Sequence, residues 1–190
     1  MNGHPRKPRR RSLFRRRDGT AAVELALISP MMLILLAGII DFGRVYREEI
    51  ELSSAVAAAA QYALINASNV TSANAASLAA TLSGIVANTS GAAWAGATVT
   101  VNAGPTNAIT GGVPAASGTA ANADSCWCPT GGSANWNWGT AVTCGSACAG
   151  GTLAGKFVTI AGTRSFTAIF SNYGLISNGT LRQSTIVQSQ

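Results

Sequence analysis

The chain has 190 residues, a formal net charge of +6 and a single histidine, His4. This length allows one modest domain with a membrane anchor. One histidine in the basic N-terminal segment cannot supply a His-based triad, and Asp124 is the only carboxylate after Glu51, so no paired acid and base is available there. We therefore expect a protein that is not an enzyme and that has no cofactor and no metal site.

The basic charge lies in residues 1–19, which we interpret as a cytoplasmic leader. They carry a net charge of +7, whereas the rest of the chain carries −1. A nucleic-acid-binding arm is the alternative, but these basic residues directly precede an apolar segment, so we expect no nucleic acid partner. By the positive-inside rule they keep the N-terminus in the cytoplasm and place the C-terminal part outside.

Residues 20–43 form the predicted transmembrane helix. From Thr20 to Ile40 the only ionisable side chain is Glu24, and about 20 mostly apolar residues can cross the roughly 30 Å hydrocarbon core as a helix. A secretory signal peptide is the alternative, although its apolar part is normally shorter. Pro30 removes one backbone hydrogen bond, so we expect a kink there.

A carboxylate inside this apolar run requires a partner, because its insertion costs on the order of 2.5 to 3.5 kcal/mol. One candidate partner is the arginine cluster at 15–17, reached by snorkelling. A second interpretation comes from the spacing, because Glu24 follows Gly19 by five positions directly after the basic leader. Together with Pro30 and the run Asp41-Phe42-Gly43-Arg44, this pattern resembles type IV prepilins and, more narrowly, the TadE-like family of tight-adherence minor pseudopilins.

The resemblance implies a role and a set of partners. A prepilin peptidase would cut between Gly19 and Thr20, and Glu24 would pair with the new amine of a neighbouring subunit. Pro30 would match the family's mid-helix proline, and residues 41–44 would match its membrane exit motif. The protein would be a non-catalytic, single-pass subunit of a bacterial inner membrane, with a periplasmic or extracellular head. Its partners would be other pseudopilins, the major pilin and the pilus assembly platform.

Residues 44–66 form the predicted periplasmic extension of the same helix. Their apolar side chains recur at helical spacing, which predicts one buried stripe: Val45, Leu52, Val56, Ala59 and Ala63. Arg44 lies four residues before Glu48, and Arg47 four before Glu51, so we expect two ion pairs on the solvated side. A separate short helix after the membrane segment is the alternative.

Residues 67–190 form the predicted extracytoplasmic head, of the α+β class. We expect a helix over 72–87, whose packed side is Ala76, Leu78, Ala79, Leu82, Ile85 and Val86. Alternating apolar residues predict strands at 97–103, within 156–170 and at 181–187, with a bulge or bend at Gly162 and a turn over 172–179. A small antiparallel sheet packed on the helical spine gives a pilin-like shape.

Residues 104–151 show no periodicity and contain every cysteine: Cys126, Cys128, Cys144 and Cys148. An even number of cysteines outside the cytoplasm predicts disulfides, with a zinc site as the alternative. Three pairings exist, and a bond within Cys126-x-Cys128 would be strained. We therefore expect each of these two to reach Cys144 or Cys148, which ties the loop together.

The same loop holds three tryptophans: Trp127, Trp136 and Trp138. They either pack against the disulfides or form a contact surface for a carbohydrate or a partner subunit. The second possibility supports an alternative function for the chain, that of a membrane-anchored binding module or adhesin with a disulfide-stabilised, Trp-rich loop.

Overall fold

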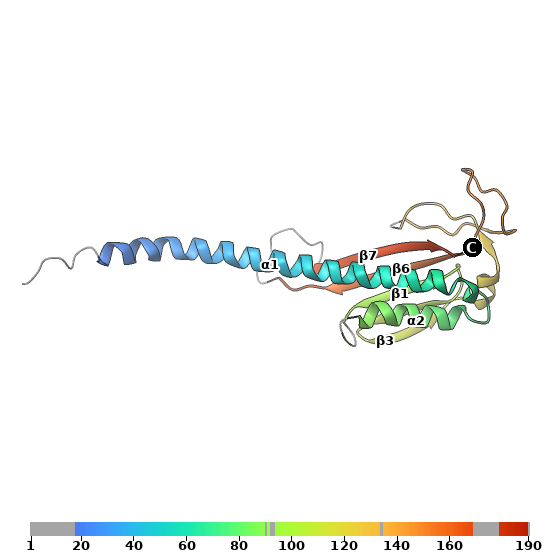
Figure 1. Cartoon of the computed structure of the whole chain (residues 1–190), viewed down its shortest axis with the longest axis horizontal. Helices are drawn as coiled ribbons and strands as arrows, with labels where there is room; N and C mark the ends of the chain where they lie inside the picture. The colour runs from blue at the N-terminus through green and yellow to red at the C-terminus, as the bar shows by residue number, and fades with distance from the viewer. Residues whose placement is uncertain (1–17, 90, 92–93, 134, 169–178, 190) are drawn as a thin grey trace, which may run out of the picture.

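The computed structural model describes residues 18–89, 91, 94–133, 135–168 and 179–189. The leader up to residue 17 and most of the predicted turn at 172–179 lie outside them. Figure 1 shows one long helix, α1, that projects from a head built of a second helix and a sheet. The α+β class predicted from the sequence is confirmed.

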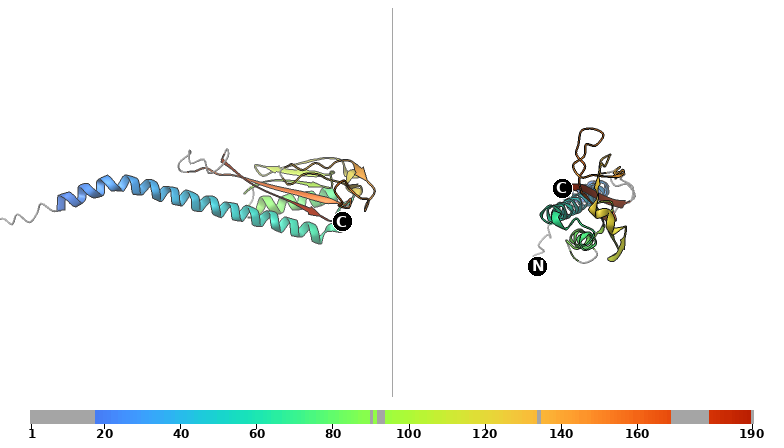
Figure 2. Two further views of the ribbon diagram at one scale, coloured as in Figure 1. Left: turned by 90° about the horizontal axis from the view of Figure 1, so that it is seen from above. Right: turned by 90° about the vertical axis from the view of Figure 1, so that its right-hand side faces the viewer.

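Helix α1 spans Asp18–Ile65, 48 residues without interruption, so the membrane segment and its extension form a single element as predicted. Pro30 lies inside the helix and does not end it. Figure 2 shows a change of direction in the blue N-terminal part of α1, the part that contains Pro30. A missing backbone hydrogen bond at a proline accounts for such a bend.

Five antiparallel strands form the main sheet, in the order β3-β2-β1-β6-β7. Their bounds are β1 Gly96–Val101, β2 Thr106–Thr110, β3 Val113–Ser117, β6 Phe157–Ser165 and β7 Thr180–Gln188. Helices α1 and α2 (Ala75–Asn88) lie along one face of this sheet (Figure 2, left). The two-residue strands β4 (Cys126–Trp127) and β5 (Ala141–Val142) form a separate pair, and two 3-10 helices, η2 (Ala67–Asn69) and η3 (Ala120–Asp124), lie in the connections.

The core lies between the helices and the sheet. It takes Leu52, Val56, Ala59 and Ala63 from the predicted stripe of α1, and Val45 packs beside Leu52 at its margin. The packed side of α2 differs slightly from the prediction, because Ala76 is exposed and Ile85 only half buried. Its buried residues are Ala75, Leu78, Ala79, Leu82, Ser83, Val86 and Ala87.

The prediction of an unstructured loop from residue 104 is wrong for its first part, which forms the β2–β3 hairpin. Pro114 pairs with Ile109 in this hairpin, and Gly111 and Gly112 form its turn with φ of 57° and 80°. Positive φ at both central positions is typical of a type I′ turn, which favours glycine. Every residue of β3 is exposed, so no apolar alternation marks the strand in the sequence.

Gly162 forms neither a bulge nor a bend, contrary to the prediction. It pairs in continuous register with Ala97 on one side and Gln183 on the other. A Cβ atom there would lie 2.8 Å from Leu52 Cδ1 and 3.1 Å from Val86 Cγ1. The glycine is therefore explained by the close approach of both helices to the sheet.

Candidate functional site

The first half of α1 presents its apolar side chains outward. Large hydrophobic residues from Val23 to Phe42 are about half to three-quarters exposed, for example Leu27 at 75% and Ile39 at 71%. An 18-residue window of this helix has a mean hydropathy of 2.3 and is not buried inside the protein. At 1.5 Å per residue, 20–40 span about 31 Å, close to the thickness of the hydrocarbon core. This segment fits a single-pass membrane anchor.

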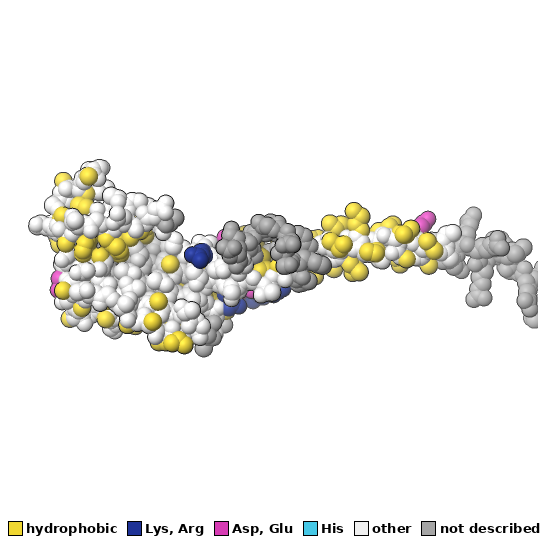
Figure 3. Space-filling view, turned by 180° about the vertical axis from the view of Figure 1, so that it is seen from behind, with side chains coloured by type: hydrophobic (Ala, Val, Ile, Leu, Met, Phe, Trp, Pro, Cys, Tyr) yellow, Lys and Arg dark blue, Asp and Glu magenta, His cyan; other side chains and the backbone are white. Residues whose placement is uncertain are grey.

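Glu24 projects from this apolar surface near its N-terminal end, where Figure 3 shows one acidic side chain among hydrophobic ones. Gly19 and Thr20 lie in the first turn of α1 and are both exposed, and no heavy atom lies within 4 Å of a Cβ built on Gly19. The ion pairs among the described residues do not include Glu24. The proposed partner at 15–17 lies outside those residues.

The predicted exit motif lies where α1 meets the head. Asp41 is only 3% exposed, and its Oδ1 lies 3.6 Å from Arg44 Nη1. The guanidinium of Arg44 also lies over the ring of Phe166, 5.2 Å from its centroid. Phe42 stacks on Tyr46 with 6.5 Å between ring centroids. Gly43 has open space around it.

The predicted pair between Arg44 and Glu48 is wrong, because Glu48 turns toward the sheet instead. Its Oε2 lies 3.3 Å from Nε of Arg164 on β6, 116 residues further along the chain. Arg164 donates to the carbonyl of Trp94 and lies over its ring at 5.0 Å. The other predicted pair is confirmed, with 2.9 Å between Arg47 Nε and Glu51 Oε1. One arginine of the sheet thus ties the helix to the loop before β1.

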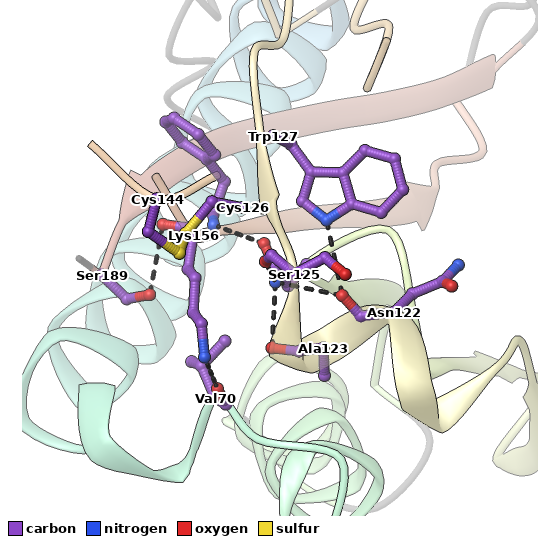
Figure 4. The surroundings of a disulfide bond; sticks show 11 residues. Val70, Asn122, Ala123, Ser125, Cys126, Trp127, Cys144, Lys156 and Ser189 are labelled. Atoms are coloured by element: carbon purple, nitrogen blue, oxygen red, sulfur yellow. Dashed lines mark hydrogen bonds between the residues drawn. A yellow bond between two sulfur atoms is a disulfide. The ribbon is translucent and has the colours of Figure 1, made fainter. Parts of the chain in front are cut away.

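Two disulfides hold the distal loop, in agreement with the prediction. Cys126 bonds to Cys144, with 4.9 Å between their Cα atoms, and Cys128 bonds to Cys148, with 5.5 Å. No group of three or more potential metal ligands occurs among the described residues. The cysteines therefore serve as cross-links, in the surroundings that Figure 4 shows for the first bridge.

The buried side chain of Asn102 clamps the start of this loop to the sheet. Its Nδ2 donates to the carbonyl oxygens of Ala123 at 3.0 Å and Ser125 at 2.6 Å, and its Oδ1 accepts from Phe157 N at 3.2 Å. Asn102 has φ of 54°, and Ala103 after it has 53°, so β1 ends at Val101 and not at Ala103 as predicted. Asparagine tolerates this left-handed backbone better than most residues.

Lys156 and Asp124 connect the same region to the α1–α2 turn. Lys156 is 8% exposed, and its Nζ donates to Val70 O at 2.7 Å (Figure 4). Asp124 Oδ1 accepts from Ser72 N at 2.8 Å. The side-chain hydrogen bond of Ser72, then its backbone hydrogen bond, and the charge of Lys156 hold the pKa of Asp124 below its ordinary value.

Sequence reasoning missed Asn102, Lys156 and Arg164, whose partners are distant in the chain. Asn102 gave one usable signal, because it opens the turn-forming run Asn-Ala-Gly-Pro. Lys156 also gave a signal in the sequence. It is the only lysine after residue 7, and it immediately precedes an apolar strand.

The tryptophans pack mainly on one another. Trp136 contacts Trp138 at 5.4 Å and Phe157 at 5.6 Å between ring centroids, and Trp127 contacts Trp138 at 6.5 Å, each edge to face. Trp127 is nearly buried. These contacts favour the structural interpretation of the aromatic residues over a contact surface, because edge-to-face pairs stabilise a cluster beyond the area that they bury.

The match found by comparison with known proteins covers helix α1 alone. A family model described as TadE-like protein matches residues 19–61, which is nearly all of α1 and none of the sheet. No curated protein and no solved structure matches the chain. The matched segment contains Glu24, Pro30 and the exit motif, the residues on which the sequence resemblance rests. The segment from Gly19 to Gln61 is thus similar to the TadE-like family.

Proposed function

We propose that this chain is a minor pseudopilin that takes part in the assembly of a tight-adherence pilus. The observation that carries the proposal is the TadE-like match over a helix whose apolar half exposes Glu24 one turn after Gly19 and Thr20. Such a helix can be held in a membrane and can pack against the helices of other subunits. The protein acts as a structural subunit and not as a catalyst.

Processing would create the partner of Glu24. Hydrolysis of the bond between Gly19 and Thr20 by a prepilin peptidase leaves a free α-amine on Thr20, in or near the hydrocarbon layer. An unpaired carboxylate there is costly, so an ammonium group on a neighbouring subunit would stabilise the assembled state relative to the isolated one. The exposure of Glu24 is consistent with a contact between subunits.

The orientation follows from the charge of the leader. Residues 1–19 carry a net charge of +7 directly before the span, which favours a cytoplasmic N-terminus and a head outside the inner membrane. The two disulfides of the head are consistent with an oxidising compartment. Pseudopilins, the major pilin and the assembly platform would be the partners on that membrane.

The mature N-terminus provides the test. The full chain is expressed in cells with a working prepilin peptidase and in matched cells without it, and the purified protein is examined by N-terminal sequencing and intact mass. We expect Thr20 as the first residue in the former and Met1 in the latter. A chain that keeps its leader in both would contradict the proposal, and a start near Ile39 would indicate a secreted protein instead.

A further inference from the structure

We propose that the head binds a neutral sugar in a hollow between the end of α1 and the start of α2. This interhelical hollow has a volume of about 120 Å³, and six side chains line it: Tyr62, Asn69, Asn74, Ser77, Leu78 and Thr81. The inference concerns the head alone and depends neither on cleavage of the leader nor on pilus assembly.

The interhelical hollow lies at the end of the head that is remote from the membrane segment. Tyr62 belongs to the last turn of α1, and Asn74 directly precedes α2. Figure 1 shows these two helix ends side by side, at the opposite end of the molecule from the apolar half of α1. At 1.5 Å per residue, Tyr62 lies about 33 Å beyond Ile40, where the apolar run ends. A sugar outside the membrane can therefore reach the hollow without contact with the bilayer.

Three polar side chains of the hollow have unused hydrogen-bonding capacity. The hydroxyls of Tyr62 and Ser77 and the amide of Asn74 bond to no group within the described part of the chain. Asn74 occupies the position before α2, but its side chain does not cap the helix. A hydroxyl and a primary amide can each donate and accept. The three groups together therefore offer both donors and acceptors to one ligand.

Two further polar side chains are already ordered by contacts within the protein. Thr81 Oγ1 donates to Ser77 O at 2.9 Å, and the oxygen of this hydroxyl can still accept a hydrogen bond. Asn69 Nδ2 donates to Asn66 Oδ1, and Asn66 Nδ2 donates in turn to Tyr62 O at 2.9 Å. A side chain that is ordered before binding loses less entropy when a ligand arrives. These contacts therefore favour binding.

The chemistry of the lining matches a neutral sugar. No charged side chain lines the hollow, so an ionic ligand would lose hydration there without gaining a counter-charge. Leu78, only 4% exposed, and the ring of Tyr62, 39% exposed, add apolar surface. A sugar ring uses both kinds of surface, because it carries hydroxyls around faces of C–H groups. The hollow is smaller than the roughly 300 to 1,000 Å³ of pockets for drug-sized ligands, which favours a single ring.

Saturation-transfer difference NMR of the full chain in phospholipid nanodiscs tests the proposal. The probes are the methyl glycosides of glucose, galactose, mannose and N-acetylglucosamine. Each is used at about 10 mM, because we expect a dissociation constant on the order of 1 mM for a ring held by a few neutral hydrogen bonds. We expect at least one probe to show saturation transfer above that in empty nanodiscs. Transfer to none of the four would overturn the proposal.

A charged probe tests the neutral character of the site. Glucose 6-phosphate presents the same ring as methyl glucoside with an added anion, and no cation lines the hollow. We expect it to show weaker transfer than the best neutral probe. Stronger transfer to the phosphate ester would contradict the proposed ligand class.

Variants test whether the sugar lies in the hollow. In Asn74→Ala/Ser77→Ala, the loss of two neutral hydrogen bonds should raise the dissociation constant of the best probe about ten-fold. Ser77→Lys should abolish binding, because a long side chain would occupy the hollow. Ser53→Lys is the matched control, since Ser53 is an exposed serine of α1 outside the hollow, and it should bind like the parent.

The variants are expected to fold, because Asn74, Ser77 and Ser53 are all exposed, and circular dichroism checks this. Binding that stays unchanged in both hollow variants would overturn the proposal, since the sugar would then bind elsewhere, for example on the tryptophans. Reconstitution needs no peptidase or pilus machinery, so failure here is distinct from failure of the proposed function.

Discussion

The two halves of α1 direct their apolar side chains oppositely, although they form one helix. From Thr20 to Ile40 the large apolar side chains point outward and the single carboxylate is exposed among them. From Leu52 to Ala63 the apolar side chains point inward against the sheet. The first half therefore fits a lipid environment, whereas the second half packs against other parts of the same chain.

This contrast predicts that changes in the first half affect assembly and changes in the second half affect folding. The largest effect is expected from Glu24→Ala, because loss of one member of a buried charge pair costs about 3 to 5 kcal/mol. Piliation should fall strongly while the protein still fractionates with the membrane. Ser29→Ala, on the same helix, is the control. Unchanged piliation in Glu24→Ala would remove the assembly role of this carboxylate.

The second expected effect concerns the head alone. The double variant Cys128→Ser/Cys148→Ser should lose about 2 to 4 kcal/mol of unfolding free energy, because the open loop gains entropy in the unfolded chain. Guanidinium titration followed by tryptophan fluorescence measures this loss, with Thr140→Ala as a control in the same loop. Membrane insertion should not change. A variant as stable as the parent would show that the Cys126–Cys144 disulfide and the hydrogen bonds of Asn102 hold the loop without this bridge.

Gly162 tests the close contact between helix and sheet. Gly162→Ala places a methyl group 2.8 Å from Leu52 Cδ1, and overpacking of this kind costs about 1 to 3 kcal/mol. Gly84→Ala is the matched control, because nothing lies within 4 Å of its added Cβ and alanine is favoured over glycine in a helix by about 1 kcal/mol. Opposite shifts in melting temperature are expected. Two shifts of the same sign would contradict this explanation of Gly162.

The smallest expected effect is on the pH dependence of the unfolding free energy, through Asp124. The pKa of Asp124 is lowered in the folded state, first by the side-chain hydrogen bond of Ser72. A carboxyl group whose pKa is lowered by folding stabilises the folded state at any pH above its pKa in the unfolded chain, which is near 3.9. This stabilisation is lost as the pH falls through the lower pKa of the folded state. Asp124→Asn should therefore flatten the stability curve below about pH 4. Curves for parent and variant that stay parallel as the pH falls below about 4 would show that this aspartate contributes nothing.

The contrast also explains how much the sequence could predict. Helix α1 was predicted along its length because lipid and core each impose a pattern that is local in sequence, an apolar run and then a stripe. The number of possible disulfide pairings was reduced because a bond within Cys126-x-Cys128 would be strained. The β2–β3 hairpin was missed since β3 is exposed on both faces, and its Gly111-Gly112 turn was the only signal. Contacts such as that of Glu48 with Arg164 join residues too distant in sequence for any local pattern to reveal.

The unbroken course of α1 has a mechanical consequence. Because one helix runs from Asp18 to Ile65, a pull on the part of α1 after the Pro30 bend would be transmitted along the helix to the sheet through Leu52 and its neighbours. A subunit lifted out of the bilayer would carry its head with it. A twist applied to α1 on the C-terminal side of the Pro30 bend would turn the head by the same angle.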